Sequence, residues 1–108
     1  MNVHIYEGEV MKSIILQNVF NFDTCIPIIY DEDGPWHIPG VHMVSPAECS
    51  EADLVDAIPK ALSRENKQCA VIYMNVPRDS NRFLILYALL QYEEYPGTVI
   101  LMCKGAGY

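Results

Sequence analysis

The sequence predicts a small α/β domain over residues 1–108, in which N-terminal strands of a mixed sheet precede an αβαβ unit with parallel C-terminal strands. Three observations predict it. Residues 51–64 have apolar side chains at helical spacing on one side only. Residues 68–76 and 98–103 are almost continuously apolar, as in parallel strands covered on both faces, and a helical segment at 80–93 separates them. A chain of 108 residues needs only one core, so we expect a single domain.

The N-terminal part gives shorter signals. VHIY at 3–6 predicts a short strand, and SIILQNVF at 13–20 favours a strand, although its apolar residues also fit helical spacing. CIPIIY at 25–30 is apolar and β-branched, but Pro27 has no N–H and therefore predicts an edge strand or a bulge. VHMV at 41–44 predicts a short extended segment.

Two serines mark the start of the first long helix. Ser45 and Ser50 each precede an acid by three residues, a pattern typical of helix N-termini, so a short turn should lead into the helix at 51–64. Pro59 falls on its polar side, where it leaves the buried face intact. The apolar face of this helix comprises Leu54, Val55, Ile58, Ala61 and Leu62.

The helix at 80–93 is apolar on two sides. One sheet face buries only one stripe, so the helix predicts contact with a copy of this chain or with a different protein, unless another element covers the second stripe. The candidate self-association residues of a homodimer are Phe83, Leu86, Tyr87 and Leu90. The second stripe comprises Ile85, Ala88, Leu89 and Tyr92.

The net charge of −7 is divided unevenly along the chain. Residues 1–56 contain ten acids and one lysine, whereas residues 57–108 contain four acids and six bases. An acidic protein repels phosphate backbones, so we expect no direct binding to nucleic acid. The longest apolar run, at 83–90, is far shorter than the roughly 20 residues that cross a membrane.

The four cysteines and the N-terminus indicate a compartment. The cysteines are too widely spaced for a zinc ribbon or a thioredoxin-type pair, so we expect reduced thiols and no cofactor. The N-terminal residues include acids where a secretory signal would have bases. We therefore expect a soluble, cytoplasmic protein.

The segment DEDGPWHIPGVH at 31–42 combines acids with the only tryptophan. His37 and His42 are too few to predict a metal site, and no cysteine–histidine signature is present. An aromatic anchor beside carboxylates favours binding to a basic protein surface. Alternatively, the tryptophan is buried and the acids are solvated. The candidate partner-binding residues are Asp31, Glu32, Asp33, Trp36, Glu48, Glu51, Asp53 and Asp56.

A second candidate site lies where the two C-terminal strands end. Carboxyl ends of parallel strands meet at one edge, where basic side chains near a helix N-terminus can bind a phosphate or carboxylate. The chain lacks a glycine-rich phosphate loop, so an ordinary solvated turn is the alternative. The candidate anion-binding residues are Arg78, Ser80, Asn81, Arg82 and Lys104.

These patterns leave two main functional hypotheses. The first is a small acidic protein-binding module, of the inhibitor or immunity-protein type, which occupies a basic site on another protein. The second is a homodimeric α/β domain, or small enzyme, that binds a small anion at the Arg78, Arg82 and Lys104 edge. A structural subunit of a larger assembly is a third. We favour binding over catalysis and name no catalytic residue, because no set of acid, base and nucleophile can be assembled.

Overall fold

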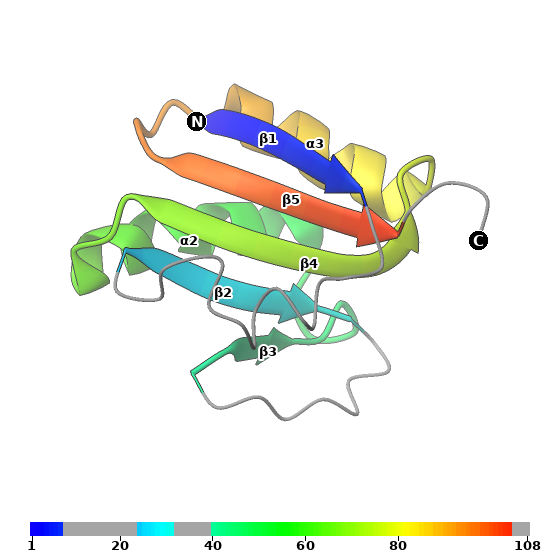
Figure 1. Cartoon of the computed structure of the whole chain (residues 1–108), viewed down its shortest axis with the longest axis horizontal. Coiled ribbons are helices and arrows are strands. Elements are labelled where there is room, and N and C mark those ends of the chain that lie inside the picture. The colour runs from blue at the N-terminus through cyan, green and yellow to red at the C-terminus, as the bar shows by residue number, and fades with distance from the viewer. Residues whose placement is uncertain (8–23, 32–39, 105–108) are drawn as a thin grey trace.

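The computed structural model describes residues 1–7, 24–31 and 40–104, which form a five-stranded sheet in the order β1-β5-β4-β2-β3 with two helices on one face (Figure 1). The predicted α/β class and its C-terminal αβαβ unit are confirmed. Every pairing among the described strands is parallel, so the expectation of a mixed sheet was wrong. The elements are β1 (Asn2–Glu7), β2 (Cys25–Tyr30), β3 (His42–Val44), α2 (Glu51–Glu65), β4 (Cys69–Pro77), α3 (Asn81–Tyr92) and β5 (Thr98–Lys104).

The position of β2 in the sheet differs from the prediction, and its pairing explains why Pro27 is tolerated there. β2 lies between β4 and β3, so it is neither an edge strand nor a bulge, as Pro27 had suggested. The pairing with β3 begins only at Ile28, however, and the half of β2 that contains Pro27 pairs with β4 alone. A residue without an N–H is tolerated where one side of the strand needs no ladder hydrogen bond. The predicted strand at 13–20 lies outside the described residues.

The helix α2 begins and ends as local chemistry dictates. The Ser50 hydroxyl accepts a hydrogen bond from the Asp53 N–H at 3.2 Å, which confirms the predicted cap. At the other end Asn66 has φ 55°, a left-handed conformation that asparagine adopts more readily than most residues, and its N–H bonds to the Leu62 and Ser63 carbonyls. These two ends fix the helix over fifteen residues.

The main core lies between the sheet and the two helices. α2 buries the apolar face that the sequence predicts, with Ala61 half-buried at its margin. α3 buries Phe83, Leu86 and Leu90, each with no exposed surface. The strands contribute alternate residues to this face, as the pleat requires: Ile26, Ile28 and Tyr30 from β2, Ala70, Ile72 and Met74 from β4, and Val99, Leu101 and Cys103 from β5.

The opposite sheet face has a smaller apolar cluster. Its buried residues are the intervening ones of the central strands: Cys25, Ile29, Val71, Tyr73 and Met102. Both faces of the central strands are therefore buried, which explains why the runs at 68–76 and 98–103 do not alternate with polar residues. In the described part of the chain, no helix is long and apolar enough to span a membrane.

Candidate functional site

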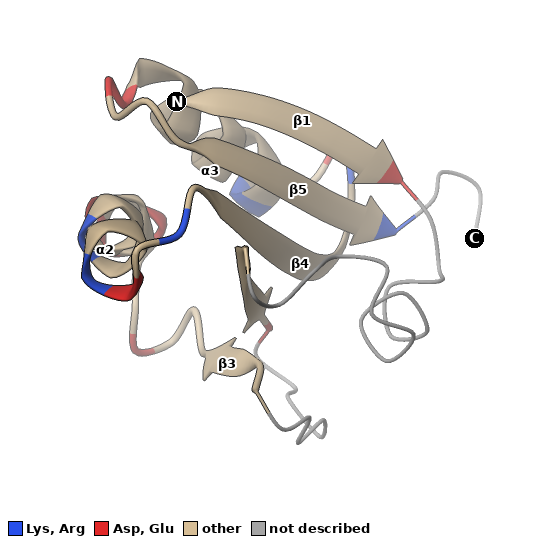
Figure 2. Cartoon of the chain, turned by 60° about the vertical axis from the view of Figure 1, so that its left-hand side comes forward, with Lys and Arg blue, Asp and Glu red and all other residues tan. Residues whose placement is uncertain are grey.

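The candidate functional site is the carboxyl edge of the sheet, the edge where all five parallel strands end and where both helices begin (Figures 1 and 2). The chain that leaves β2 leads to β3, whereas the chain that leaves β4 leads to β5 on the other side. The connections therefore diverge between the adjacent strands β2 and β4. In α/β sheets such a point is the usual place for a binding site.

A buried tyrosine lies at this point. The Tyr30 hydroxyl, at the end of β2, donates a hydrogen bond of 2.5 Å to the Cys49 carbonyl oxygen in the turn before α2. Burial, with the nearby Glu51 carboxylate as the second cause, raises the pKa of Tyr30 to about 12. Burial, Asp53 and Glu51 likewise raise the pKa of the Cys49 thiol. Tyr30 therefore remains protonated and anchors the turn that starts α2.

Two ion pairs join elements across the edge. Arg82, in the first turn of α3, lies 3.7 Å from the carboxylate of Glu51, the first residue of α2. Arg78 lies 3.6 Å from the carboxylate of Glu7 at the end of β1. Both pairs are partly exposed, so each contributes roughly 0–1 kcal/mol. Their main effect is to neutralise the two arginines that the sequence nominates for anion binding.

The other candidate anion-binding residues lie at the same edge. Ser80 is the N-cap of α3, but its side chain makes no capping hydrogen bond within the described part of the chain. Asn81 is exposed, and Lys104 is exposed at the end of β5, opposite Pro77. The structure thus places all five candidates on one edge, with the two arginines facing carboxylates.

The candidate acidic residues divide into three groups. Glu48, Glu51 and Asp53 surround the start of α2, and Asp31 follows β2, so these four lie at the carboxyl edge. Asp56 lies further along α2 in an exposed pair with Lys60, at 3.1 Å. The remaining candidates, Glu32, Asp33 and Trp36, lie outside the described residues.

Sequence reasoning missed several members of this site. Glu7 and Asp79 add two carboxylates to the edge, and the buried Tyr30 lies at the end of β2 at the same edge. A strand end at residue 6 was predicted, but nothing in the sequence indicated that β1 pairs with β5. Among the described residues, the edge bears six carboxylates (Glu7, Asp31, Glu48, Glu51, Asp53 and Asp79) against three bases (Arg78, Arg82 and Lys104).

The candidate self-association residues lie mostly in the core. Phe83, Leu86 and Leu90 pack against the sheet and Tyr87 is half-buried, so a surface made of these four is not available. Phe83, Leu86 and Leu90 recur at helical spacing, so they lie on one side of α3, and this is the side that the sheet buries. The outer face instead presents Leu84, Ile85, Ala88 and Tyr92.

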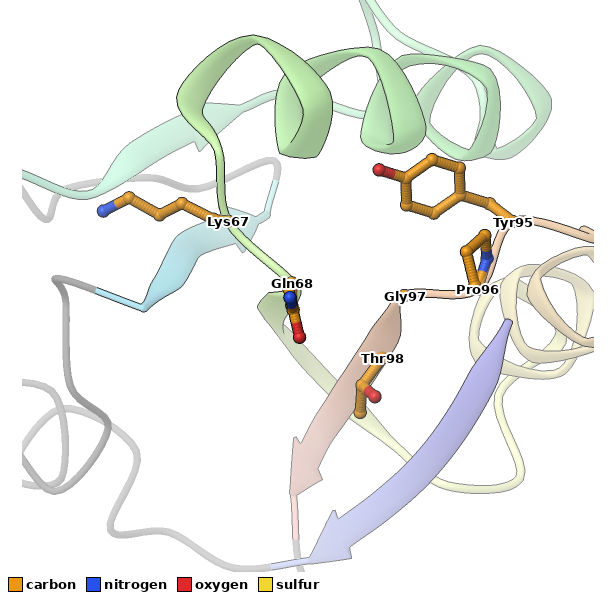
Figure 3. A pocket seen from close by; sticks show the side chains of 6 residues that line it. All are labelled: Lys67, Gln68, Tyr95, Pro96, Gly97 and Thr98. Atoms are coloured by element: carbon orange, nitrogen blue, oxygen red, sulfur yellow. The ribbon is translucent and has the colours of Figure 1, made fainter.

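Two pockets lie away from the carboxyl edge. One, of about 290 Å³, lies at the amino edge between the segments that lead into β4 and β5 (Figure 3). It is lined by Lys67, Gln68, Tyr95, Pro96, Gly97 and Thr98. The second, of about 170 Å³, is mainly apolar and lies between α2 and the strands β2 and β3. Neither is lined by a residue predicted to bind a partner or an anion, although the second includes His42 and the apolar-face residues Leu54, Ile58 and Ala61.

Metal chemistry and relatives add no further assignment. Within residues 1–7, 24–31 and 40–104, no three histidine, cysteine or acidic side chains are grouped to hold a metal ion. Comparisons with protein-family models, curated proteins and solved structures find no match for this chain. The function is therefore inferred from the residues of the carboxyl edge.

Proposed function

We propose that this protein is a small acidic protein-binding module that presents the carboxyl edge of its sheet to a basic surface on another protein. One observation supports the proposal above all. Acids that are scattered from residue 7 to residue 79 gather at one edge, where they outnumber the bases by six to three among the described residues. Such an arrangement is what an inhibitor or immunity-type protein needs to cover a basic site.

The placement of the acids also fits a docking role. Glu48 and Asp53 are exposed beside the capped N-terminus of α2, and Asp79 is exposed before α3. Asp53 lies in the first turn of α2, and the turns that contain Glu48 and Asp79 lead directly into α2 and α3. These helix starts restrict the backbone at all three positions, which lowers the entropic cost of binding. Long-range attraction from a carboxylate-rich edge would increase the association rate and would weaken with salt.

The test uses matched charge changes on opposite edges. The edge variant Glu48→Gln/Asp53→Asn removes two exposed carboxylates from the carboxyl edge. The control Glu65→Gln/Glu94→Gln removes two exposed carboxylates from the amino edge, so both variants change the net charge equally. Each chain is immobilised through a linker on its N-terminus, which lies at the amino edge (Figure 1) and leaves the carboxyl edge free.

Lysate of the source cells is passed over the three proteins at about 50 mM and about 500 mM salt. Wild type and control should retain the same basic protein at low salt, and the edge variant should retain about fivefold less, since two interfacial charges contribute about 0.5 kcal/mol each. High salt should release it from all three. Equal loss in both variants, or no retained protein at either salt, would contradict the proposal.

A small anion at the start of α3 is the second candidate function. The observation that favours it is the N-terminus of α3, which lacks a side-chain cap within the described residues and has Arg82 in its first turn. Glu51 already faces Arg82, which weakens the case. Inorganic phosphate should raise the melting temperature of the wild type and not of Arg82→Gln; no rise in either excludes this candidate.

We also propose a cytoplasmic location. All four cysteines are free, including the two that are buried. Unpaired thiols are typical of proteins in reducing compartments.

A further inference from the structure

Two of the four cysteines lie directly opposite each other on neighbouring strands. Cys25 is the first residue of β2, Cys69 is the first residue of β4, and the two are partners in the parallel register. Partners in register point to the same sheet face, and both residues belong to the smaller apolar cluster. The neighbouring Cys25 thiol is also, after burial, a cause of the raised pKa of Cys69.

The other two cysteines have no such neighbour among the described residues. Cys49 lies in the turn before α2 at the opposite, carboxyl edge. Cys103 lies near the end of β5 on the face that the helices cover. Only Cys25 and Cys69 are therefore placed to react with one another.

We propose that Cys25 and Cys69 form a thiol–disulfide exchange site, which takes a small-molecule disulfide such as oxidised glutathione and closes into an intramolecular disulfide. The distance between neighbouring strands, about 4.8 Å, falls within the range of Cα separations that a disulfide spans. The closed bond would tie the amino ends of β2 and β4 together. The site is independent of the proposed partner-binding edge, which lies at the other end of the sheet.

The exchange proceeds in two displacement steps. The Cys69 thiolate, which is half-buried where Cys25 is buried, attacks one sulfur of the small disulfide and releases one small thiolate. The Cys25 thiolate then attacks Cys69 Sγ in the mixed disulfide, forms the bond between the two cysteines and releases the second small thiolate. Two protein thiols are oxidised, the small disulfide is reduced to two thiols, and the protons pass to solvent or to the released thiolates.

The surroundings of Cys69 make this exchange slow at neutral pH. Burial, and then the interaction with the Cys25 thiol, raise the pKa of Cys69 to about 12, so little thiolate is present at pH 7. Among the described residues, Cys25 is the titratable group that affects this pKa. Because the thiolate is the nucleophile, the rate should rise about tenfold for each pH unit between 7 and 9.

The test oxidises the folded, full-length chain with oxidised glutathione at pH 7, 8 and 9. Remaining thiols are alkylated in denaturant, and trypsin with a glutamate-specific protease then separates the four cysteines into different peptides. We expect a peptide pair linked through Cys25 and Cys69, with the rate increasing with pH. The oxidised chain should also melt at a higher temperature, and dithiothreitol should reverse the change.

The matched control is Cys25→Ser, which retains Cys69 without its partner. This variant should accumulate a mixed disulfide on Cys69, and its melting temperature should not rise on oxidation. The wild-type experiment needs no variant to fold, so it decides the question alone. Alkylation of both cysteines after oxidation at pH 9, or linkage through Cys49 instead, would overturn the proposal.

Discussion

The helices α2 and α3 pack on the same sheet face, but the outer surface of α2 is charged and that of α3 is apolar. α2 is charged on its outer side, where Asp56 and Lys60 form an exposed pair. α3 has no charge between Arg82 and Glu93, and its outer Leu84, Ile85 and Tyr92 are 48%, 49% and 85% exposed. The difference teaches that the sheet decides burial: it takes one stripe from each helix, however apolar the rest of the helix is.

The two helix N-termini also differ, in their caps and in the charge of their first turns. α2 begins with a serine cap and with Glu51 and Asp53 in its first turn, acids that stabilise the positive end of the helix dipole. α3 begins at Ser80 without a side-chain cap in the described structure, and has Arg82 in place of an acid. Because Glu51 also faces Arg82, the first turn of α2 supplies negative charge to both helix starts.

The largest expected effect comes from the two sides of α3. Leu86→Ala removes a side chain with no exposed surface, so it should lower the free energy of unfolding by about 3 kcal/mol through lost burial and the cavity left behind. Leu84→Ala is the matched change on the outer face and should cost within about 0.5 kcal/mol. Urea unfolding of both variants measures the difference. Equal losses would mean that the outer face of α3 is covered in solution.

An intermediate effect on the free energy of unfolding is expected from Tyr30, which is buried at the carboxyl edge where the two helices begin. The folded state holds its pKa at about 12 and the unfolded state near 10, so the unfolded chain releases the proton first. The stabilisation from protonated Tyr30 is complete below pH 10 and is lost as the pH rises through 12, by about 3 kcal/mol in total.

Tyr30→Phe tests this sign. At pH 8 the variant should be less stable by about 1 kcal/mol, because it lacks the hydrogen bond to the Cys49 carbonyl. Between pH 10 and 12 the difference in unfolding free energy should shrink and then reverse, because only the wild type has the Tyr30 hydroxyl and is destabilised as it loses its proton. Urea unfolding at each pH provides the comparison, and a deficit that does not change with pH would refute it.

The fold was predictable wherever a local pattern was strong. Ser50 with its acid three residues on marked the start of α2, and the continuous apolar run at 68–76 marked β4 as a central strand. The inference from Pro27 was wrong, because a local rule about a missing N–H does not include that β2 begins to pair with β3 only one residue later, at Ile28. The same limit applies to the parallel sheet, because strand direction depends on how distant segments pair.

The candidate site was predictable only in pieces. Arg78 and Arg82 were recognised because they follow a predicted strand and start a predicted helix. Their partners Glu7 and Glu51 come from elements far away in the sequence, so the neutralising pairs could not be foreseen. The acidic and basic candidates were treated as separate sites, whereas strand order brings both to one edge.

The smallest expected effect is the difference in unfolding free energy between removing the two helix caps. Ser50→Ala removes a hydroxyl that accepts a hydrogen bond from the Asp53 N–H, so it should cost about 1 kcal/mol of unfolding free energy. Ser80→Ala removes a hydroxyl without a capping bond in the described residues, and should cost only a few tenths of a kcal/mol. Both changes are serine to alanine at an N-cap with extended backbone, so propensity cancels and the cap bond remains. If Ser80→Ala proved as costly as Ser50→Ala, the start of α3 would be capped in solution, and the contrast between the two helix N-termini would disappear.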